Sequence, residues 1–377
     1  MRVGFEAKRI FNNFTGLGNY GRFLVRALLE NYPQHHYTLY TPKLKDHPEV
    51  MPFLKNPAFH IRTPSQWVKG SGFGSFWRSV NLGNIASRDG VELLHGLSNE
   101  IPLTKPDRLK TVVTIHDLIF KRYPELYSKV DAVIYTKKLI HACHSADRII
   151  AISRQTADDI RAYADVDEKK IRIVYQGCHQ QFYTPVHAGS QASVKTKYGL
   201  PDRYVLSVGT LEERKNALII LKALAQLDPS VSLVLVGKAT AYQRELDRFI
   251  ARHRLHSRVH FIHQVAFADL PAIYQQAGVF VYPSRFEGFG IPVVEAIASG
   301  VPVIAAKGSS LKEAGGEGSL YIDPDSEQEL AEGIERLLAD TSLCESMVSQ
   351  SQEHIRKFAP QNIARDMMTV YGELVQS

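Results

Sequence analysis

Short runs of β-branched and aromatic residues alternate with amphipathic helical segments along both halves of the chain. In the first half, strands are predicted at Arg2–Phe5, Tyr37–Tyr40, Val91–Leu94, Thr111–Ile115 and Arg148–Ile152. In the second half, they are predicted at Tyr204–Val208, Ser232–Val236, Val259–Ile262, Val279–Tyr282 and Val301–Ala305. Helical segments such as Arg22–Leu29 and Ala217–Leu227 lie between them. This order predicts the α/β class, with parallel sheets covered by helices on both faces.

A chain of 377 residues exceeds the usual size of one hydrophobic core, so two doubly wound, Rossmann-like domains are expected. We place the first at residues 1–182 and the second at 197–358. Residues 183–196 are small and polar, without periodicity, and are predicted to be a linker. The final segment, 359–377, is predicted to be an amphipathic helix that could pack on either domain; we assign it to the first. The domains are expected to face each other across a cleft.

Composition excludes several classes of protein. A hydrophobic share of 44% with 22% charged residues is ordinary for a globular protein. The start, MRVGFEAKRI, is too polar for a signal peptide, and no run is long and apolar enough to span a bilayer. Three scattered cysteines, Cys143, Cys178 and Cys344, fit a reducing cytosol and form neither a disulfide framework nor a zinc spacing. We therefore expect a cytoplasmic protein.

The charge is unevenly distributed. Residues 1–190 carry 26 Lys and Arg against 17 Asp and Glu, whereas the remainder carries 19 against 22. A basic first half suggests an anionic partner, such as a phospholipid surface or a pyrophosphate-linked substrate. A charge imbalance without function explains the count equally well. A nucleic-acid partner is disfavoured, because the charge is diffuse and no binding module is recognisable.

The stretch PSRFEGFGIPVVEAIASGVP, residues 283–302, places two carboxylates, Glu287 and Glu295, in an apolar context. A strand precedes it and Pro292 suits the first turn of a helix. Gly288 and Gly290 let the backbone approach a ligand where that helix presents unpaired N–H groups, an arrangement that binds phosphate. Glu295 lies among apolar neighbours, where a carboxylate needs hydrogen-bonding partners such as sugar hydroxyls. A turn residue and a helix-capping acid are the structural alternative.

Two further strand ends carry polar residues. In SVGTLEERKN, Arg214 and Lys215 follow a strand and could neutralise a diphosphate. In TVVTIHDL, His116 ends an apolar strand and would lie at the edge of the cleft, although a buried structural histidine is the competing interpretation.

Weaker patterns lie elsewhere in the chain. Gly16 and Gly18 begin a G-x-G-x-x-G loop, but no acid follows the next strand, which disfavours an NAD-dependent oxidoreductase. This loop could still cradle a phosphate. His141 and His144 have helical spacing for a metal but lack further ligands, so no metal site is predicted.

With EGFGIPVVE, GTLEERKN, VTIHDL, GLGNY and SADRIIAIS in this order, the chain resembles the retaining, nucleotide-sugar-dependent glycosyltransferases of family 4, which have the GT-B fold. It looks most like the bacterial mannosyltransferase-type enzymes that build surface polysaccharides. The resemblance spans nearly the whole chain, and its most specific motif is the E-x7-E pair Glu287 and Glu295.

The resemblance implies a role for each candidate residue. Glu295 is expected on the ribose hydroxyls, Glu287 on the transferred sugar and His116 on the sugar ring at the reaction centre. The backbone of Gly288, Phe289 and Gly290 and the Gly16–Gly18 loop would hold the diphosphate, with Arg214 and Lys215 neutralising it. No divalent metal and no other cofactor is implied, because the cations and the helix end would stabilise the leaving group.

The chain departs from the family pattern at three places. Thr210 stands where many relatives have an arginine, so Arg214 is expected to replace it. Gln176-Gly177-Cys178 replaces the usual N-G-V turn, and His263 replaces a glycine near the expected base. The last change leaves the choice of base open.

The expected activity is transfer of a hexose, mannose from GDP-mannose, onto a glycan or lipid-linked saccharide, with retention through same-face attack. Peripheral contact with the inner face of the membrane is expected to accompany a lipid-linked acceptor. The alternatives are a UDP-hexose donor, a soluble sugar acceptor, or a nucleotide-sugar-binding protein without transfer activity.

Overall fold

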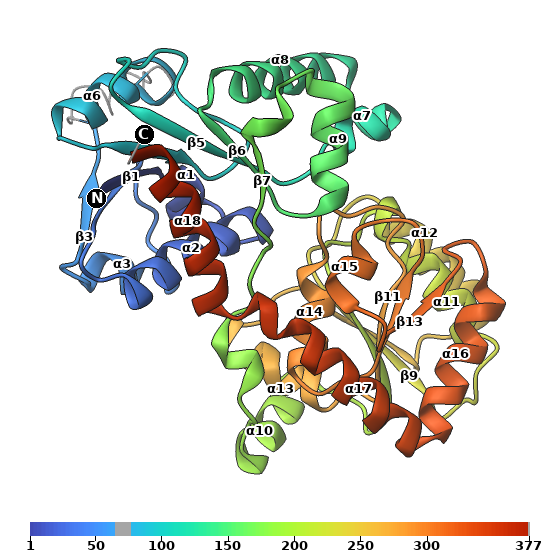
Figure 1. Ribbon diagram of the computed structural model, residues 1–377. Helices are drawn as coiled ribbons and strands as arrows, with labels where there is room; N and C mark the ends of the chain where they lie inside the picture. Colours follow the sequence, from blue (N-terminus) through green and yellow to red (C-terminus); the bar gives the residue numbers. More distant parts are fainter. Residues whose placement is uncertain (65–76, 376–377) are drawn as a thin grey trace. The chain divides into compact units, whose positions relative to one another are not determined.

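The computed structural model describes residues 1–64 and 77–375, which divide into two compact units. Unit 1 comprises Met1–Gly177 and the C-terminal segment from Pro360, and unit 2 comprises Cys178–Ala359. Each unit contains one parallel sheet with helices packed on it (Figure 1). The prediction of two doubly wound α/β domains is confirmed.

The described part of unit 1 has a seven-stranded sheet in the order β3-β2-β1-β4-β5-β6-β7. Its strands are β1 (Arg2–Glu6), β2 (His36–Tyr40), β3 (Phe59–Arg62), β4 (Leu93–Gly96), β5 (Lys110–Ile115), β6 (Arg148–Ala151) and β7 (Ile171–Ile173). Its helices are α1 (Lys8–Asn12), α2 (Gly16–Asn31), α3 (Met51–Lys55), α6 (Leu82–Arg88), α7 (Ile119–Arg122), α8 (Lys129–Ser145), α9 (Arg154–Ala164) and α18 (Pro360–Val375).

The sheet of unit 2 has six strands in the order β10-β9-β8-β11-β12-β13 within the described residues. These are β8 (Tyr204–Val208), β9 (Ser232–Val236), β10 (Val259–Ile262), β11 (Val279–Tyr282), β12 (Val303–Ala306) and β13 (Leu320–Ile322). The helices are α10 (Ala188–Tyr198), α11 (Ala217–Leu224), α12 (Gln243–His253), α13 (Leu270–Gln275), α14 (Ile291–Ala298), α15 (Leu311–Gly315), α16 (Glu327–Ala339) and α17 (Thr341–Ile355).

Three strands, β3, β7 and β13, were not predicted from the sequence. All three lie at sheet edges and are three or four residues long. An edge strand buries only part of its surface, so its sequence lacks the apolar run that marks a central strand.

The predicted linker at residues 183–196 is wrong, because most of it forms helix α10 of unit 2. Val194 is the buried residue of this helix, so no apolar periodicity marks it in the sequence. Polar contacts with α13 hold the segment instead. The Gln275 side-chain oxygen accepts hydrogen bonds from the Val186 N–H (2.9 Å) and the Gln191 amide (3.4 Å). The boundary between the units lies earlier, at Gly177 and Cys178.

Helix α18 belongs to unit 1 and lies beside α2 (Figure 1). A buried polar network fixes it. The Tyr371 hydroxyl lies 2.6 Å from His95 Nδ1, and His95 Nε2 lies 2.8 Å from Thr114 Oγ1, which also contacts the Tyr20 hydroxyl at 2.9 Å. Burial lowers the pKa of His95 to about 3, so this histidine is neutral at physiological pH. Residues 376–377 of the predicted final helix lie outside the described residues.

Within residues 1–64 and 77–375, no helix has the length and hydropathy required for a membrane span.

Candidate functional site

The turn between β11 and α14 carries Glu287 and is held by contacts from other elements. The Ser310 hydroxyl lies within hydrogen-bond distance of the carbonyl oxygens of Glu287 (2.8 Å) and Phe289 (3.0 Å). Gly290 precedes α14 with a φ of +112°, and a Cβ there would lie 2.7 Å from a Leu311 methyl group. Only glycine tolerates both the positive φ and the close contact with Leu311. This explains why a glycine stands directly before α14.

The Glu287 carboxylate binds the two predicted cations through one oxygen. Its Oε1 atom lies 2.9 Å from Lys215 Nζ and 3.0 Å from Arg214 Nη1. Hydroxyl donors from Ser284 (2.7 Å) and Tyr282 (3.0 Å) reach the same oxygen. Neither the hydrogen bonds nor the ion pairs within residues 1–64 and 77–375 include Glu287 Oε2. One carboxylate oxygen is therefore saturated, and the other can accept from a ligand.

The electrostatics of this cluster keep Glu287 ionised. Burial alone would raise its pKa, but the Lys215 and Arg214 cations outweigh burial and hold the pKa at about 2. Burial alone would likewise lower the pKa of Lys215, but Glu287 and Tyr282 raise it above its ordinary value. Glu287 and Lys215 thus stabilise each other in their charged forms.

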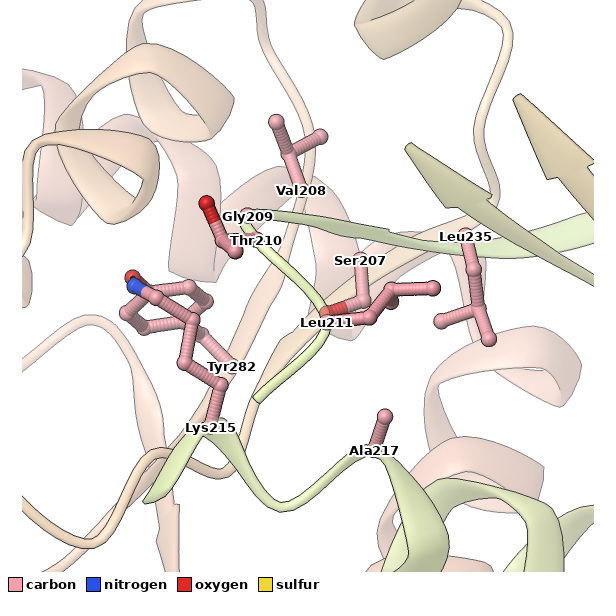
Figure 2. Close-up of a pocket in the computed structure, with 9 residues that line it drawn as sticks. All are labelled: Ser207, Val208, Gly209, Thr210, Leu211, Lys215, Ala217, Leu235 and Tyr282. Carbon is pink, nitrogen blue, oxygen red and sulfur yellow. Dashed lines mark hydrogen bonds between the residues drawn. The ribbon is translucent and has the colours of Figure 1, made fainter. Parts of the chain in front are cut away.

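Lys215 also lines a small pocket at the carboxyl end of β8, together with Gly209, Thr210 and Tyr282 (Figure 2). Its ammonium donates to the Tyr282 hydroxyl at 2.5 Å, and Figure 2 shows the two side chains meeting beside Thr210. Arg214 instead donates to the Phe286 carbonyl and pairs with Glu212 at 2.6 Å. Both cations therefore lie at a strand end, as predicted, with much of their charge compensated by acids of unit 2.

Glu295 lies on α14, is 9% exposed and accepts a hydrogen bond from the Tyr274 hydroxyl at 3.0 Å. Burial raises the pKa of its carboxyl group to about 7, against a smaller lowering by Tyr274. In contrast to Glu287, no cation is among the causes of its shift. The two glutamates of the motif thus have opposite electrostatic environments.

His116, in unit 1, is buried and uses both ring nitrogens inside that unit. Nε2 lies 2.8 Å from the Leu97 carbonyl oxygen, which can only accept, so Nε2 carries the proton. Nδ1 then accepts from the Gln176 side-chain amide at 3.1 Å. Burial lowers the pKa of His116 to about 4, so the ring is neutral at physiological pH. A sugar hydroxyl would have to replace Gln176 to bond Nδ1.

Gly16 and Gly18 form the first turn of α2 rather than a loop before it. The Gly18 N–H donates to Asn13 Oδ1 at 3.2 Å, and a Cβ at Gly18 would lie 1.8 Å from the Asn13 carbonyl oxygen. A Cβ at Gly16, in contrast, would meet no atom within 4 Å. Close packing thus explains Gly18, and its N–H already has a partner.

The structure brings Arg214, Lys215, Glu287 and the Gly288–Gly290 turn together in unit 2, with Glu295 on the helix that follows the turn. His116, Gly16 and Gly18 lie in unit 1.

Several residues that support the site were not predicted from the sequence. Tyr282 ends the apolar strand β11 and Ser284 lies two residues later, so both could have been found by position. Ser310, Tyr274 and Gln176 come from other elements and carry no local signal.

Metal-ligating side chains do not converge in the described ranges, where no group of three His, Cys, Asp or Glu side chains is present. His141 and His144 each direct Nε2 toward a backbone carbonyl oxygen, of Pro102 (3.3 Å) and Ala164 (3.0 Å). Their helical spacing therefore has a structural explanation.

Comparison with known proteins covers both units. Residues 14–181 match the family described as Glycosyltransferase Family 4, and residues 191–354 match Glycosyl transferases group 1. The chain is 30% identical to the O-antigen chain mannosyltransferase B of Escherichia coli, over 71% of each chain. It is 28% identical to the O-antigen chain mannosyltransferase RfbU of Salmonella typhimurium, over 70% of this chain and 69% of that one.

Solved structures share the fold. The Anabaena protein Alr3699/HepE, solved in complex with UDP-glucose, superposes with a TM-score of 0.76 at 19% identity, over 99% of this chain and all of that one.

Proposed function

Since the chain belongs to the family 4 glycosyltransferases, we propose that it transfers mannose from GDP-mannose to a glycan or lipid-linked saccharide, with retention of configuration and without a metal. The observation that carries this proposal is the Glu287 carboxylate, whose Oε1 holds two cations while Oε2 remains able to bind a sugar hydroxyl. The mannose assignment is supported by two O-antigen mannosyltransferase relatives.

In this proposal the donor binds to unit 2. The diphosphate lies at the N-terminus of α14, beside the Gly288–Gly290 backbone, where the helix dipole favours negative charge. Arg214 and Lys215 stabilise the charge that develops as the diphosphate leaves. Glu287 Oε2 accepts a hydroxyl of the transferred sugar, and Glu295 accepts the ribose hydroxyls. These contacts orient the donor and need no cofactor.

In the transfer step, the acceptor hydroxyl oxygen forms a bond to the anomeric carbon as the bond from that carbon to the diphosphate oxygen breaks. The diphosphate takes the electron pair, and a phosphate oxygen on the same face takes the acceptor proton. The low pKa of Glu287 favours this route, because a carboxylate stabilised by two cations is a weak base and a weak nucleophile. A covalent sugar trapped on Glu287 would refute it.

Calorimetric titration of the full chain tests the donor. We expect GDP-mannose to bind at least about tenfold more tightly than UDP-glucose, a difference of about 1.4 kcal/mol. A tenfold preference for UDP-glucose would overturn the mannose assignment and favour the UDP-hexose alternative. Donor binding without turnover in the presence of lipid-linked or soluble saccharides from the host would favour a binding protein that lacks transfer activity. Anomeric configuration, read by NMR of the product, tests retention.

We further propose that unit 1 contacts an anionic membrane surface through the first turns of α8. Val130, Val133 and Ile134 are 68%, 54% and 43% exposed, and Lys129 and Lys137 lie on the same helix. Exposed apolar side chains beside lysines suit the interface of an anionic bilayer. This contact would serve a lipid-linked acceptor.

Co-sedimentation with vesicles containing 30 mol% phosphatidylglycerol tests this contact. We expect V130D/I134D to reduce the bound fraction at least about fivefold, and 0.5 M salt to weaken binding of the unchanged chain. L54D, at another exposed apolar position (41% exposed), serves as the control. Binding that resists salt, or that L54D weakens equally, would contradict the assignment.

A further inference from the structure

A second buried charge cluster lies in unit 1, on residues that the site above does not use. Glu6 ends β1 and is 2% exposed. Arg78, on the helical turn η1 (Trp77–Asn81), pairs with Glu100 and lies 3.9 Å from Glu6 Oε1. Lys138, on α8, also binds Glu100, at 2.7 Å. Residues from four separate places in the sequence thus meet beyond the carboxyl end of β1, the edge where parallel sheets bind ligands.

These residues surround a cavity of about 210 Å³. Ile101 and Leu103 add apolar surface to its lining, and Lys137 adds a further cation. Drug-sized ligands occupy pockets of about 300–1,000 Å³, so this volume suits a smaller molecule of the size of one sugar ring.

Glu6 is the unusual member of the cluster. Its Oε1 accepts the Lys8 N–H at 3.3 Å, but across the described ranges none of the hydrogen bonds and ion pairs includes Oε2. Arg78 is already engaged by Glu100, and burial raises the pKa of Glu6 despite Arg78. A carboxyl oxygen that no protein group contacts can accept a hydrogen bond from a ligand. Glu6 lines the cavity, so a hydroxyl group bound there would satisfy it.

We propose that this cavity binds one neutral sugar ring of the acceptor. Sugar hydroxyls donate as well as accept, which suits a lining that offers carboxylates and cations together, and the apolar ring face suits Ile101 and Leu103. A small anion would face two carboxylates, Glu6 and Glu100. The assignment to the acceptor rests on the proposed transferase function, whereas sugar binding by the cavity does not.

The experiment titrates the full chain with methyl α-D-mannopyranoside, methyl α-D-glucopyranoside and N-acetylglucosamine, monitored by saturation-transfer NMR, with inorganic phosphate in a parallel titration. We expect at least one of the three sugars to bind at millimolar concentration and E6Q to weaken it at least about tenfold. Glutamine preserves the shape and leaves Arg78 paired with Glu100. E92Q, which changes an exposed glutamate of unit 1, is the matched control.

L103D provides an independent variant, because Leu103 is 57% exposed and its replacement spares the core. We expect L103D also to weaken sugar binding, with donor affinity within twofold of the unchanged chain in both variants. Sugar binding that is absent, or unaffected by E6Q and L103D, overturns the inference, as does binding of phosphate alone. If sugars bind as expected and no nucleotide sugar binds, the cavity assignment stands and the proposed transferase function fails.

Discussion

Replacing Glu287 by glutamine is expected to reduce turnover at least about 10³-fold and to destabilise unit 2 by about 3 kcal/mol at pH 7. Turnover falls because the sugar loses a charged acceptor at Oε2. Stability falls because Lys215 and Arg214, which are 18% and 12% exposed, lose the carboxylate that compensates them. Steady-state kinetics and urea unfolding at pH 7 measure the two effects.

The pH dependence of the free energy of unfolding tests whether loss of the Glu287 charge causes the destabilisation of E287Q. The pKa of Glu287 is depressed from 4.5 to about 2, so its stabilisation is present above pH 4.5 and is lost as the pH falls toward 2. The difference between E287Q and the unchanged chain should therefore shrink below pH 4.5. E213Q changes an exposed glutamate in the neighbouring turn and serves as the control. Equal stability of E287Q and the unchanged chain at pH 7 would show that the ion cluster is not stabilising.

Replacing Glu295 by glutamine should weaken donor binding about 10²-fold while stabilising the protein at alkaline pH. Affinity falls because the ribose hydroxyls lose hydrogen bonds to a charged group, worth about 1.5–3 kcal/mol each. Stability rises because the buried carboxylate, unlike Glu287, has no compensating cation among the causes of its pKa shift. Glutamine can still accept the Tyr274 hydrogen bond through its amide oxygen.

The direction of this stability change follows from the raised pKa of Glu295. An acid whose pKa rises from 4.5 to about 7 on folding contributes stability below pH 4.5, and this contribution is lost as the pH rises through 7. At pH 8 we expect the free energy of unfolding of E295Q to exceed that of the unchanged chain by about 3 kcal/mol. Below pH 4.5 we expect the two free energies to be equal. Thermal melts at pH 4.5 and 8 measure this, with E335Q, an exposed glutamate on α16, as the control. A destabilised E295Q at pH 8 would contradict the prediction.

Much of the fold could be predicted because central parallel strands are buried on both faces and therefore form apolar runs. Apolar runs did not predict the strands at the edges of the sheets, where β3, β7 and β13 are short. Nor did apolar periodicity predict α10, whose buried surface is a single valine within the helix, Val194. The hydrophobic periodicity of a sequence arises from burial rather than from local conformation. Helices and strands with little buried surface therefore cannot be predicted from it.

The candidate site shows the same division. Glycines and a proline around two acids marked the Glu287 turn, because close approach, a positive φ and a helix start each demand particular residue types. Ser310, Tyr274 and Gln176 carry no such mark, since each acts through side-chain hydrogen bonds to residues far away in the sequence. The Gly16–Gly18 pattern indicated a loop, but a carbonyl contact with Asn13 and a helical first turn account for it.

The sequence by itself determined the α/β architecture and the residues that meet at strand ends, because both follow from hydrophobic periodicity and from the direction of parallel strands. Only the tertiary structure decided the charge states. Glu287 and Glu295 are the same residue type eight positions apart, yet one is paired with Lys215 and Arg214 and the other is buried without them. Their opposite pKa shifts arise from desolvation and from neighbours supplied by other elements, which no local pattern encodes.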